Sequence, residues 1–359
     1  MNCCRGGCWP PWIGLWRGPE PVRVLLVKTS SLGDVIHSLP ALTDAARAIP
    51  AIRFDWLVEE AFAAVPGWHP AVAATITVPL RRLRRQPWST WRSGAWGAMK
   101  SALAGQPYDA VIDAQGLLKS AWLSRYGRGP VFGPDRDSAR ESLAARFYDK
   151  PLAVQPGQHA VERVRQLLAA ALGYPVPEAR GDSGIGARFR RPGGDAVVFL
   201  HGTTWANKHW PEDYWGELGR HLRDRGLKVQ LPWGNDAEKA RARRIADACG
   251  GEVLPAMDLT EMAGRLGAAR ACVAVDTGLG HLAAAVGTPG IALFGPTSPG
   301  LTGFYGDRQR SLAADYHCAP CLSRTCLYAT DSEPFPPCFG QLPPARVSAA
   351  LDELLEATP

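Results

Sequence analysis

Short apolar runs alternate with longer helical patterns in two series along the chain, one before and one after a segment rich in Pro and Gly. The first series opens at residues 22–29, a nearly continuous apolar run typical of a parallel strand that is covered on both faces. Strands that alternate with helices need right-handed crossover connections, and this predicts an α/β fold. We expect two Rossmann-like domains that face each other across a central cleft, with ligands at the carboxyl ends of the strands.

The expected elements and boundaries follow from these patterns. In the first series we expect strands at 22–29, 54–58 and 109–113 and a helix over 35–49, to which Pro40 is an objection. In the second series we expect strands at 196–200, 228–231, 252–254, 272–275 and 291–294, with helices at 212–225, 236–249, 259–269 and from 280. The predicted division is an extension (1–21), an N-terminal domain (22–174), a linker (175–186), a C-terminal domain (187–345) and a last helix (346–359). We expect the last helix to pack on the first domain.

The composition fits a globular protein. The chain has 359 residues, of which 46% are hydrophobic and 21% charged, so two domains are expected and disorder is not. No run reaches the ~18 uninterrupted apolar residues of a membrane-spanning helix. Prolines and glycines interrupt any apolar stretch near the start, so we predict no secretory signal and a reducing, cytoplasmic location. Since the first strand begins abruptly, we hypothesise that translation starts at Val22 and that residues 1–21 are disordered or wrongly assigned.

A basic segment gives the clearest charge signal in a chain of net charge +6. Four arginines lie within five residues, and Trp and further basic residues follow them up to Lys100. The arginines are Arg81, Arg82, Arg84 and Arg85. Basic residues interleaved with Trp suit an anionic partner or the headgroup region of a membrane. The alternative is a solvated helix face.

Asp34 follows the first predicted strand, at the point where a helix begins. One interpretation is a helix cap, which contributes roughly 0.5–2 kcal/mol. The other is a general base, because a helix N-terminus favours the ionised carboxylate that can accept a hydroxyl proton. His37, one turn later, is an alternative base or a residue that orients Asp34.

Three strand ends of the second series carry residues suited to a nucleotide diphosphate. Hydroxyls, glycines and amides at a helix start can surround phosphates, and a lysine and a histidine add charge and donors. An acidic residue after a neighbouring strand can accept from ribose hydroxyls. The residues in question are Thr203, Thr204, Lys208, Glu238, Asp276, Thr277, Gly278, Gly280 and His281. A loop-stabilising role is the alternative.

Four late cysteines, Cys318, Cys321, Cys326 and Cys338, lie within 21 residues. Four thiols at such spacing can hold Zn²⁺ tetrahedrally as a structural clip. The spacing is not that of a familiar zinc knuckle, and free or buried thiols are the alternative.

Several of these blocks resemble the lipopolysaccharide heptosyltransferases, glycosyltransferase family 9, and within them the type I enzymes. In the first half the similar blocks are residues 24–44, 54–60 and 108–120. In the second half they are residues 208–212, 231–234 and 276–281. The resemblance extends from Val22 to about Gly306, whereas the N-terminal extension and the cysteine-rich segment depart from the type I pattern.

The resemblance implies a GT-B fold and an inverting, metal-independent transfer of heptose from ADP-heptose to the Kdo sugar of Kdo2-lipid A. It implies Asp34 as the base, Thr203, Thr204 and Lys208 on the donor's phosphates and sugar, and Glu238 on the ribose. Met257 would lie near the adenine, Asp276 would bind the heptose, and Thr277, Gly278 and His281 the diphosphate. Lys28 and the four arginines would meet the anionic acceptor. The resemblance implies no cofactor beyond the donor. The structural zinc considered for the four cysteines rests on their spacing alone, with free or buried thiols as the alternative.

The expected setting is peripheral, on the cytoplasmic face of the inner membrane, with no nucleic-acid partner. Four alternatives remain. One is a family member that adds heptose to an already heptosylated core, and another is a nucleotide-sugar-binding protein without turnover. The third is a membrane-surface scaffold that uses the Arg and Trp run, and the fourth is an epimerase of similar fold that needs no acceptor. The presence of both Asp34 and the donor residues argues against a mere binder, which would need only the second half.

Overall fold

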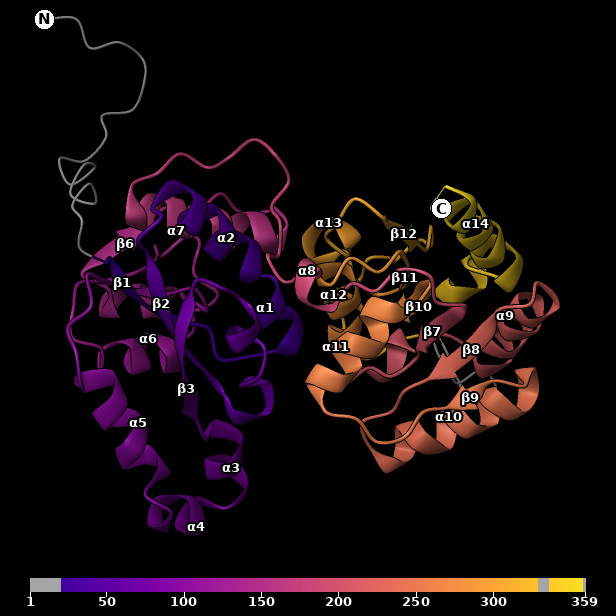
Figure 1. Ribbon diagram of the computed structural model, residues 1–359, viewed down its shortest axis with the longest axis horizontal. Coiled ribbons are helices and arrows are strands. Elements are labelled where there is room, and N and C mark those ends of the chain that lie inside the picture. The colour runs from indigo at the N-terminus through magenta and orange to yellow at the C-terminus, as the bar shows by residue number, and fades with distance from the viewer. Residues whose placement is uncertain (1–20, 329–335, 358–359) are drawn as a thin grey trace, which may run out of the picture. The chain divides into compact units, whose positions relative to one another are not determined.

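The computed structural model describes residues 21–328 and 336–357, which form two compact units (Figure 1). Of the described residues, the first unit contains 21–30, 37–156 and 161–184. The second contains residues 31–36, 157–160, 185–328 and 336–357. The predicted extension, residues 1–21, lies outside the described part except for its last residue.

The first unit is built on a six-stranded parallel sheet in the order β3-β2-β1-β4-β5-β6. Its strands are β1 (Arg23–Val27), β2 (Arg53–Glu59), β3 (Val72–Val78), β4 (Ala110–Asp113), β5 (Val131–Pro134) and β6 (Lys150–Leu152). Its helices are α2 (Leu39–Ala48), α3 (Leu80–Arg85), α4 (Pro87–Arg92), α5 (Ala95–Ala104), α6 (Leu118–Ser124) and α7 (Ala160–Leu172), with short helices η1 (Glu60–Phe62), η2 (Pro66–Trp68) and η3 (Ser142–Phe147). β1 is central and wholly buried over its last four residues, which explains its continuous apolar run.

The second unit repeats this design, with the order β12-β11-β10-β7-β8-β9. Its strands are β7 (Ala196–Leu200), β8 (Lys228–Leu231), β9 (Glu252–Val253), β10 (Ala271–Val275), β11 (Gly290–Phe294) and β12 (Gln309–Ala313), all parallel. Its helices are α1 (Leu32–Ile36), α8 (Gly186–Phe189), α9 (Glu212–Asp224), α10 (Asp236–Cys249), α11 (Leu259–Ala268), α12 (Gly278–Ala285), α13 (Pro299–Thr302) and α14 (Pro344–Glu356), with short helices η4 (Ala206–Lys208) and η5 (Pro337–Gln341). Counted along the chain, each sheet has the order 3-2-1-4-5-6, which is that of a dinucleotide-binding Rossmann fold.

The helix expected over 35–49 is two helices, α1 and α2. Pro40 lies in the first turn of α2, where its missing N–H removes no helical hydrogen bond. The proline therefore helps to begin a helix instead of bending one. The consequence for the site is that α1 is a separate short helix, and it groups with the second unit.

Helix α14 packs into the core of the second unit, so the expectation that it packs on the first domain was wrong. Its apolar face joins the cluster that contains Trp215 of α9 and Leu293 of β11. The indole of Trp210 also donates to the carbonyl of Leu342, just before α14, at 2.9 Å. The helix therefore completes the second unit. No helix in the described ranges is both long and apolar enough to span a bilayer.

Candidate functional site

The centre of the second sheet is the place where β7 and β10 pair and where the strand order reverses. Ligands of such sheets bind outside the carboxyl ends of the strands at this point. β7 is followed by Thr203 and Lys208, and β10 by Asp276. The fold thus brings together residues that are some seventy positions apart in the sequence.

An ion pair between Lys208 and Asp276 occupies this point. The Lys208 ammonium lies 2.6 Å from Oδ2 of Asp276, and both side chains are nearly buried. The same oxygen accepts a hydrogen bond of 2.8 Å from the hydroxyl of Thr297. The Thr203 hydroxyl donates to the backbone carbonyl of Asp276 at 3.2 Å. Three of the predicted donor residues therefore form one hydrogen-bonded group.

Asp276 stays ionised in this setting. Burial by itself raises the pKa of its carboxyl, but the interactions with His281 and Lys208 outweigh burial and hold the pKa well below its usual value. The Nε2 atom of His281 lies 3.7 Å from Oδ1 of Asp276, on the side opposite Lys208. A carboxylate with donors on both sides has a fixed orientation, which the sugar-binding role predicted for Asp276 would require.

α12 begins directly after Asp276 and Thr277, and its first amides have no carbonyl one turn back to bond. Such a helix start attracts a phosphate. The glycines here also serve packing, because a Cβ at Gly280 would come within 1.9 Å of the ring of Phe304. A Cβ at Gly278 would lie 2.9 Å from the Cβ of Leu32. Both glycines therefore permit close neighbours, in addition to any contact with a ligand.

Glu238 reaches from the first turn of α10 toward the end of β7. Its Oε2 atom accepts from the amide of Gly234 at 2.8 Å, and its own amide donates to the side chain of Asn235, which caps the helix. A Cβ at Gly202 would lie 2.8 Å from the Glu238 carboxyl carbon. The carboxylate thus lies beside Gly202, one residue before Thr203.

Three other residues predicted to contact the donor lie outside the hydrogen-bonded group around Asp276. Thr204 is exposed, Met257 is half-buried just before α11, and Thr277 precedes the first turn of α12. In the described part of the chain, no side-chain hydrogen bond joins any of the three to the Lys208–Asp276 pair. Their roles stay predictions.

Asp34 lies in α1, and this helix packs against the beginning of α12. A Cβ on Gly33 would come within 2.7 Å of the imidazole of His281. The Asp34 carboxylate is half-buried and accepts from the amide of Ser31 at 3.0 Å and from its hydroxyl at 3.1 Å. Asp34 therefore stabilises its own helical turn. It also follows directly after Gly33, which lies against His281 of the predicted donor site. His37 is buried and lies beyond α1.

In the first unit, the corresponding point of the sheet lies between β1 and β4. Lys28, predicted on the acceptor side, is buried, and its ammonium donates to the carbonyl of Ala114 at 2.8 Å. Gln115 was not predicted, yet its side-chain oxygen accepts from the amides of Thr29 and Ser30 at 3.1 and 3.3 Å. These contacts fix the loop that leads into α1.

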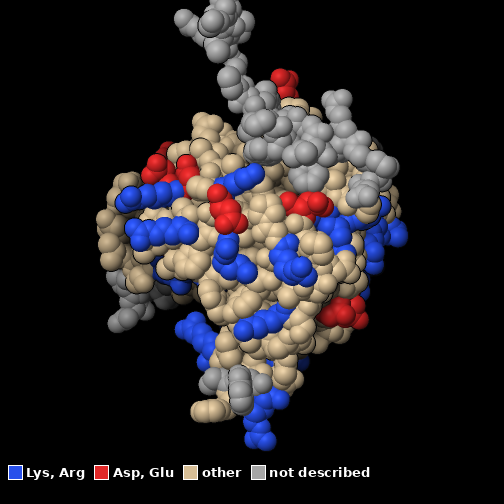
Figure 2. Space-filling model, turned by 90° about the vertical axis from the view of Figure 1, so that its left-hand side faces the viewer, with Lys and Arg blue, Asp and Glu red and all other residues tan. Residues whose placement is uncertain are grey.

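The four arginines of the basic segment all lie on α3. Arg81 pairs with the buried Glu59 at 2.6 Å, and Arg82 pairs with Glu60 at 2.7 Å. A cavity of about 270 Å³ lies between these pairs and Arg85. Burial raises the pKa of Glu59, and the charge of Arg81 opposes this effect. Figure 2 shows Lys and Arg side chains spread over this face of the first unit and down to its lower tip, where Figure 1 places α3 and α4.

Two residues of the donor group were not predicted. Thr297 lies after β11, and the strand-end rule that selected Asp276 also applies to it. The ring of Trp205 lies 4.2 Å from the Lys208 ammonium, which it fixes by a cation–π contact. No spacing in the sequence indicates that contact.

Comparisons with known proteins show which family the chain belongs to. The model of glycosyltransferase family 9 (heptosyltransferase) matches residues 96–330, more than half of the chain. Lipopolysaccharide heptosyltransferase 1 of Pseudomonas aeruginosa is 57% identical over 350 residues, which cover 94% of this chain and 99% of the relative. The chain belongs to glycosyltransferase family 9. It is therefore a glycosyltransferase, as the resemblance in the sequence predicted.

Solved structures extend the likeness to the fold. The Escherichia coli heptosyltransferase WaaC with ADP has a TM-score of 0.82 and 44% identity, covering 93% of this chain and 100% of that one. The same enzyme with ADP-2-deoxy-2-fluoro heptose has a TM-score of 0.79 and 43% identity, with 92% and 99% covered. The predicted α/β fold of GT-B type, with two Rossmann-like domains, is confirmed.

Proposed function

We propose that this chain moves L-glycero-D-manno-heptose from ADP-heptose to the Kdo sugar of Kdo2-lipid A, with inversion, in the assembly of the lipopolysaccharide inner core. The observation that carries the proposal is the position of Asp34 on a helix packed against His281, beside the Lys208–Asp276 pair. A base and a diphosphate site in one unit fit a transferase better than a binder. The identity to lipopolysaccharide heptosyltransferase 1 supports this donor and this acceptor.

The donor would lie at the carboxyl ends of β7, β8 and β10. Lys208, His281 and the first amides of α12 supply positive charge and hydrogen-bond donors for the diphosphate. Glu238 would accept from the ribose, and Asp276 from the heptose hydroxyls. The further contacts that we propose are Thr203 and Thr204 on the phosphates and sugar, Met257 on the adenine, and Thr277 and Gly278 on the diphosphate.

The reaction is a single displacement. Asp34 accepts the proton of the acceptor hydroxyl while the oxygen of that hydroxyl forms a bond to the anomeric carbon of the heptose. The bond between that carbon and the β-phosphate oxygen breaks, and the electron pair leaves with ADP. Lys208 and His281 stabilise the charge that develops on the departing diphosphate, so this chemistry needs no metal.

The acceptor side would be the first unit. Its charged face suits the phosphates and carboxylates of Kdo2-lipid A, and Arg84 and Arg85 are exposed on α3. Arg81 and Arg82 are engaged by glutamates, so they would contact the acceptor through the cavity that they line. Lys28 would act from within the sheet edge. We propose that the basic and Trp-rich segment binds the enzyme to the periphery of the inner membrane, on its cytoplasmic face, because basic residues interleaved with Trp suit an anionic headgroup region.

Product mass tests the proposal directly. The protein is incubated with ADP-heptose and Kdo2-lipid A, and one heptose is expected to be added to the acceptor. A parallel reaction offers an acceptor that already carries heptose. Transfer to the second acceptor alone would refute the assigned acceptor. Release of ADP without any glycosylated product, or epimerised donor without acceptor, would refute the transfer itself.

A further inference from the structure

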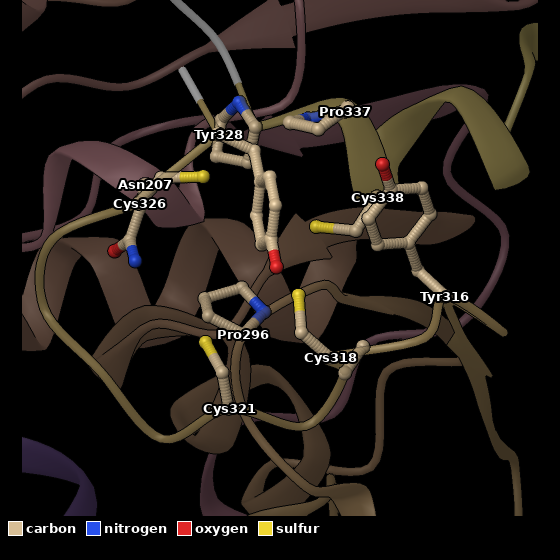
Figure 3. A pocket seen from close by; sticks show the side chains of 11 residues that line it. Asn207, Pro296, Tyr316, Cys318, Cys321, Cys326, Tyr328, Pro337 and Cys338 are labelled. Carbon is tan, nitrogen blue, oxygen red and sulfur yellow. The ribbon is translucent and has the colours of Figure 1, made fainter.

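Four cysteines from two segments line one small pocket of the second unit (Figure 3). We call them the cysteine cluster: Cys318, Cys321, Cys326 and Cys338. Three of them follow β12, in a stretch without helix or strand, and the fourth belongs to η5. In Figure 3 their sulfurs point toward a common space, with the ring of Tyr328 among them. The other residues that line the pocket are proline, alanine, tyrosine and Asn207, with no carboxylate and no histidine.

The size and chemistry of the pocket restrict what it can hold. Its volume is about 20 Å³, close to that of one water, so an organic ligand does not fit and a single ion does. Hard cations such as Ca²⁺ and Mg²⁺ need oxygen ligands, which the lining does not offer as carboxylates. Four thiolates are the usual tetrahedral ligands of structural Zn²⁺.

We propose that the cysteine cluster binds one Zn²⁺ as a structural clip. Within residues 21–328 and 336–357, no three His, Cys, Asp or Glu side chains already stand as metal ligands. Binding therefore draws the sulfurs inward, and each thiol that becomes a ligand releases its proton. Three of the ligands can move because no helix or strand constrains the chain around them.

The segment that the ion would fix supports the turn that carries Lys208. The side-chain amide of Asn207 donates to the carbonyl of Ser323 at 2.8 Å. The guanidinium of Arg324 lies 5.2 Å from the ring of Trp205, the same ring that contacts Lys208. Both contacts come from the stretch between Cys321 and Cys326, so closing the cluster on an ion would fix them.

The segment also meets the end of β11. The amide of Leu322 donates to the carbonyl of Pro296 at 2.8 Å, one residue before Thr297, which donates to Asp276. A Cβ at Gly295 would lie 3.1 Å from the sulfur of Cys338. The segment that carries the cysteine cluster therefore contacts the neighbours of both Lys208 and Thr297, the two residues whose side chains bond to Oδ2 of Asp276. If the proposed function is right, the clip also preorganises the donor site.

Metal content is the first test. The full chain is purified without chelators and without added metal, and its zinc and iron are measured by elemental mass spectrometry. About one zinc per chain is expected. A matched variant with Cys3, Cys4 and Cys8 all changed to Ser should keep the ion. Less than about one tenth of an equivalent, or zinc that is lost with these N-terminal changes, overturns the proposal, and iron in place of zinc overturns the choice of ion.

The second test changes the ligands themselves. Cys338→Ser and Cys318→Ser should each lose the ion, while Cys249→Ala, a core thiol elsewhere in the unit, should retain it. If a cysteine variant fails to fold, the ligands are identified on the native protein instead. X-ray absorption at the zinc edge of native protein should then give four sulfurs at about 2.3 Å. Nitrogen or oxygen ligands in that spectrum, or a full ion in the Cys338→Ser variant, contradict the assignment.

Stability and nucleotide binding separate this inference from the proposed function. Removal of the ion by a chelator should lower the unfolding temperature by about 5 °C or more and weaken ADP binding, both restored by zinc. Zinc present with an unchanged unfolding temperature refutes the clip. A zinc-loaded, stable protein that transfers no heptose refutes the proposed function and leaves the clip standing.

Discussion

Replacing Asp34 by Asn separates a catalytic carboxylate from a structural one. The carboxylate accepts two hydrogen bonds from Ser31, at 3.0 and 3.1 Å, so a purely structural role is a real alternative. An Asn side chain keeps an oxygen of the same shape and can still accept both bonds, but it cannot take up a proton from a hydroxyl. We expect D34N to fold as the native protein does and to transfer heptose very slowly.

The expected magnitudes follow from these contacts. A positioned general base contributes about 10²–10⁴ in rate, or roughly 3–5 kcal/mol on the barrier, and D34N should lose this. Its stability should change by a few tenths of a kcal/mol, since both bonds to Ser31 persist. D34A loses the same rate, and in addition about 0.5–2 kcal/mol of stability because the Ser31 amide loses its partner.

The assay measures turnover by product mass, ADP affinity by calorimetry and stability by urea unfolding. ADP affinity should stay within a few-fold in both Asp34 variants, because the diphosphate residues are unchanged. Ser31→Ala, which removes one of the two hydrogen bonds and no carboxylate, is the control and should keep most of its turnover. If D34N turns over at the native rate while D34A is merely unstable, Asp34 is a brace and the catalytic assignment fails.

Three further predictions concern the charges of the two units. Lys208→Met and Asp276→Asn should each lower the unfolding free energy by about 3 kcal/mol or more, because either change leaves one buried partner unpaired. The double variant should lose less than the sum of the two, and additive values in urea unfolding would contradict this. Burial, and after it the charge of Arg241, lower the pKa of His201 from 6.5 to about 4, so the unfolded chain takes up a proton that the folded chain refuses. The loss of this one group's contribution should lower the unfolding free energy by up to about 3 kcal/mol between pH 6.5 and 4, so the slope should be shallower in His201→Gln. Equal slopes would refute this. Changing Arg84 and Arg85 to Ser should raise KM for Kdo2-lipid A, leave ADP binding unchanged and weaken sedimentation with anionic vesicles, and an unaltered KM would place the acceptor elsewhere.

The sequence predicted the buried strands better than the edge strands. β7 and β10 are apolar runs in the middle of their sheet, and the alternation of strands with helices in the second half located them within a residue or so. β3 and β12 lie at sheet edges with several exposed residues, so they have no continuous apolar run to detect. β5 and β6 were missed because Gly133, Pro134 and Pro151 interrupt their apolar pattern with residues that are typical of turns.

In the candidate site, the positions of the residues were predicted and the contacts between them were not. The residues after β7 and β10 were predicted because a rule of topology places strand ends together, whatever the sequence separation. The pairing itself was not, because no pattern indicates that Lys208 would meet Asp276 across 68 positions. Sequence spacing did not predict the role of Gln115 either, because its contacts with Thr29 and Ser30 depend on the register of β1 and β4.

The position of Lys208 bears on how the donor's charge is met. An ammonium has three N–H donors, and here one is directed at Asp276 while the indole of Trp205 lies 4.2 Å away. The long side chain is thereby ordered before any ligand arrives, and the entropy of fixing it is not lost in the reaction. Asp276 also balances the charge of Lys208 at rest, and its hydrogen bond from Thr297 keeps it in place. As the diphosphate departs with its additional charge, Lys208 can turn a remaining N–H toward it without a new arrangement of the loop. We therefore propose that, in the transfer reaction proposed above, the ion pair is the resting state of a preorganised leaving-group site and not a stabilising contact alone.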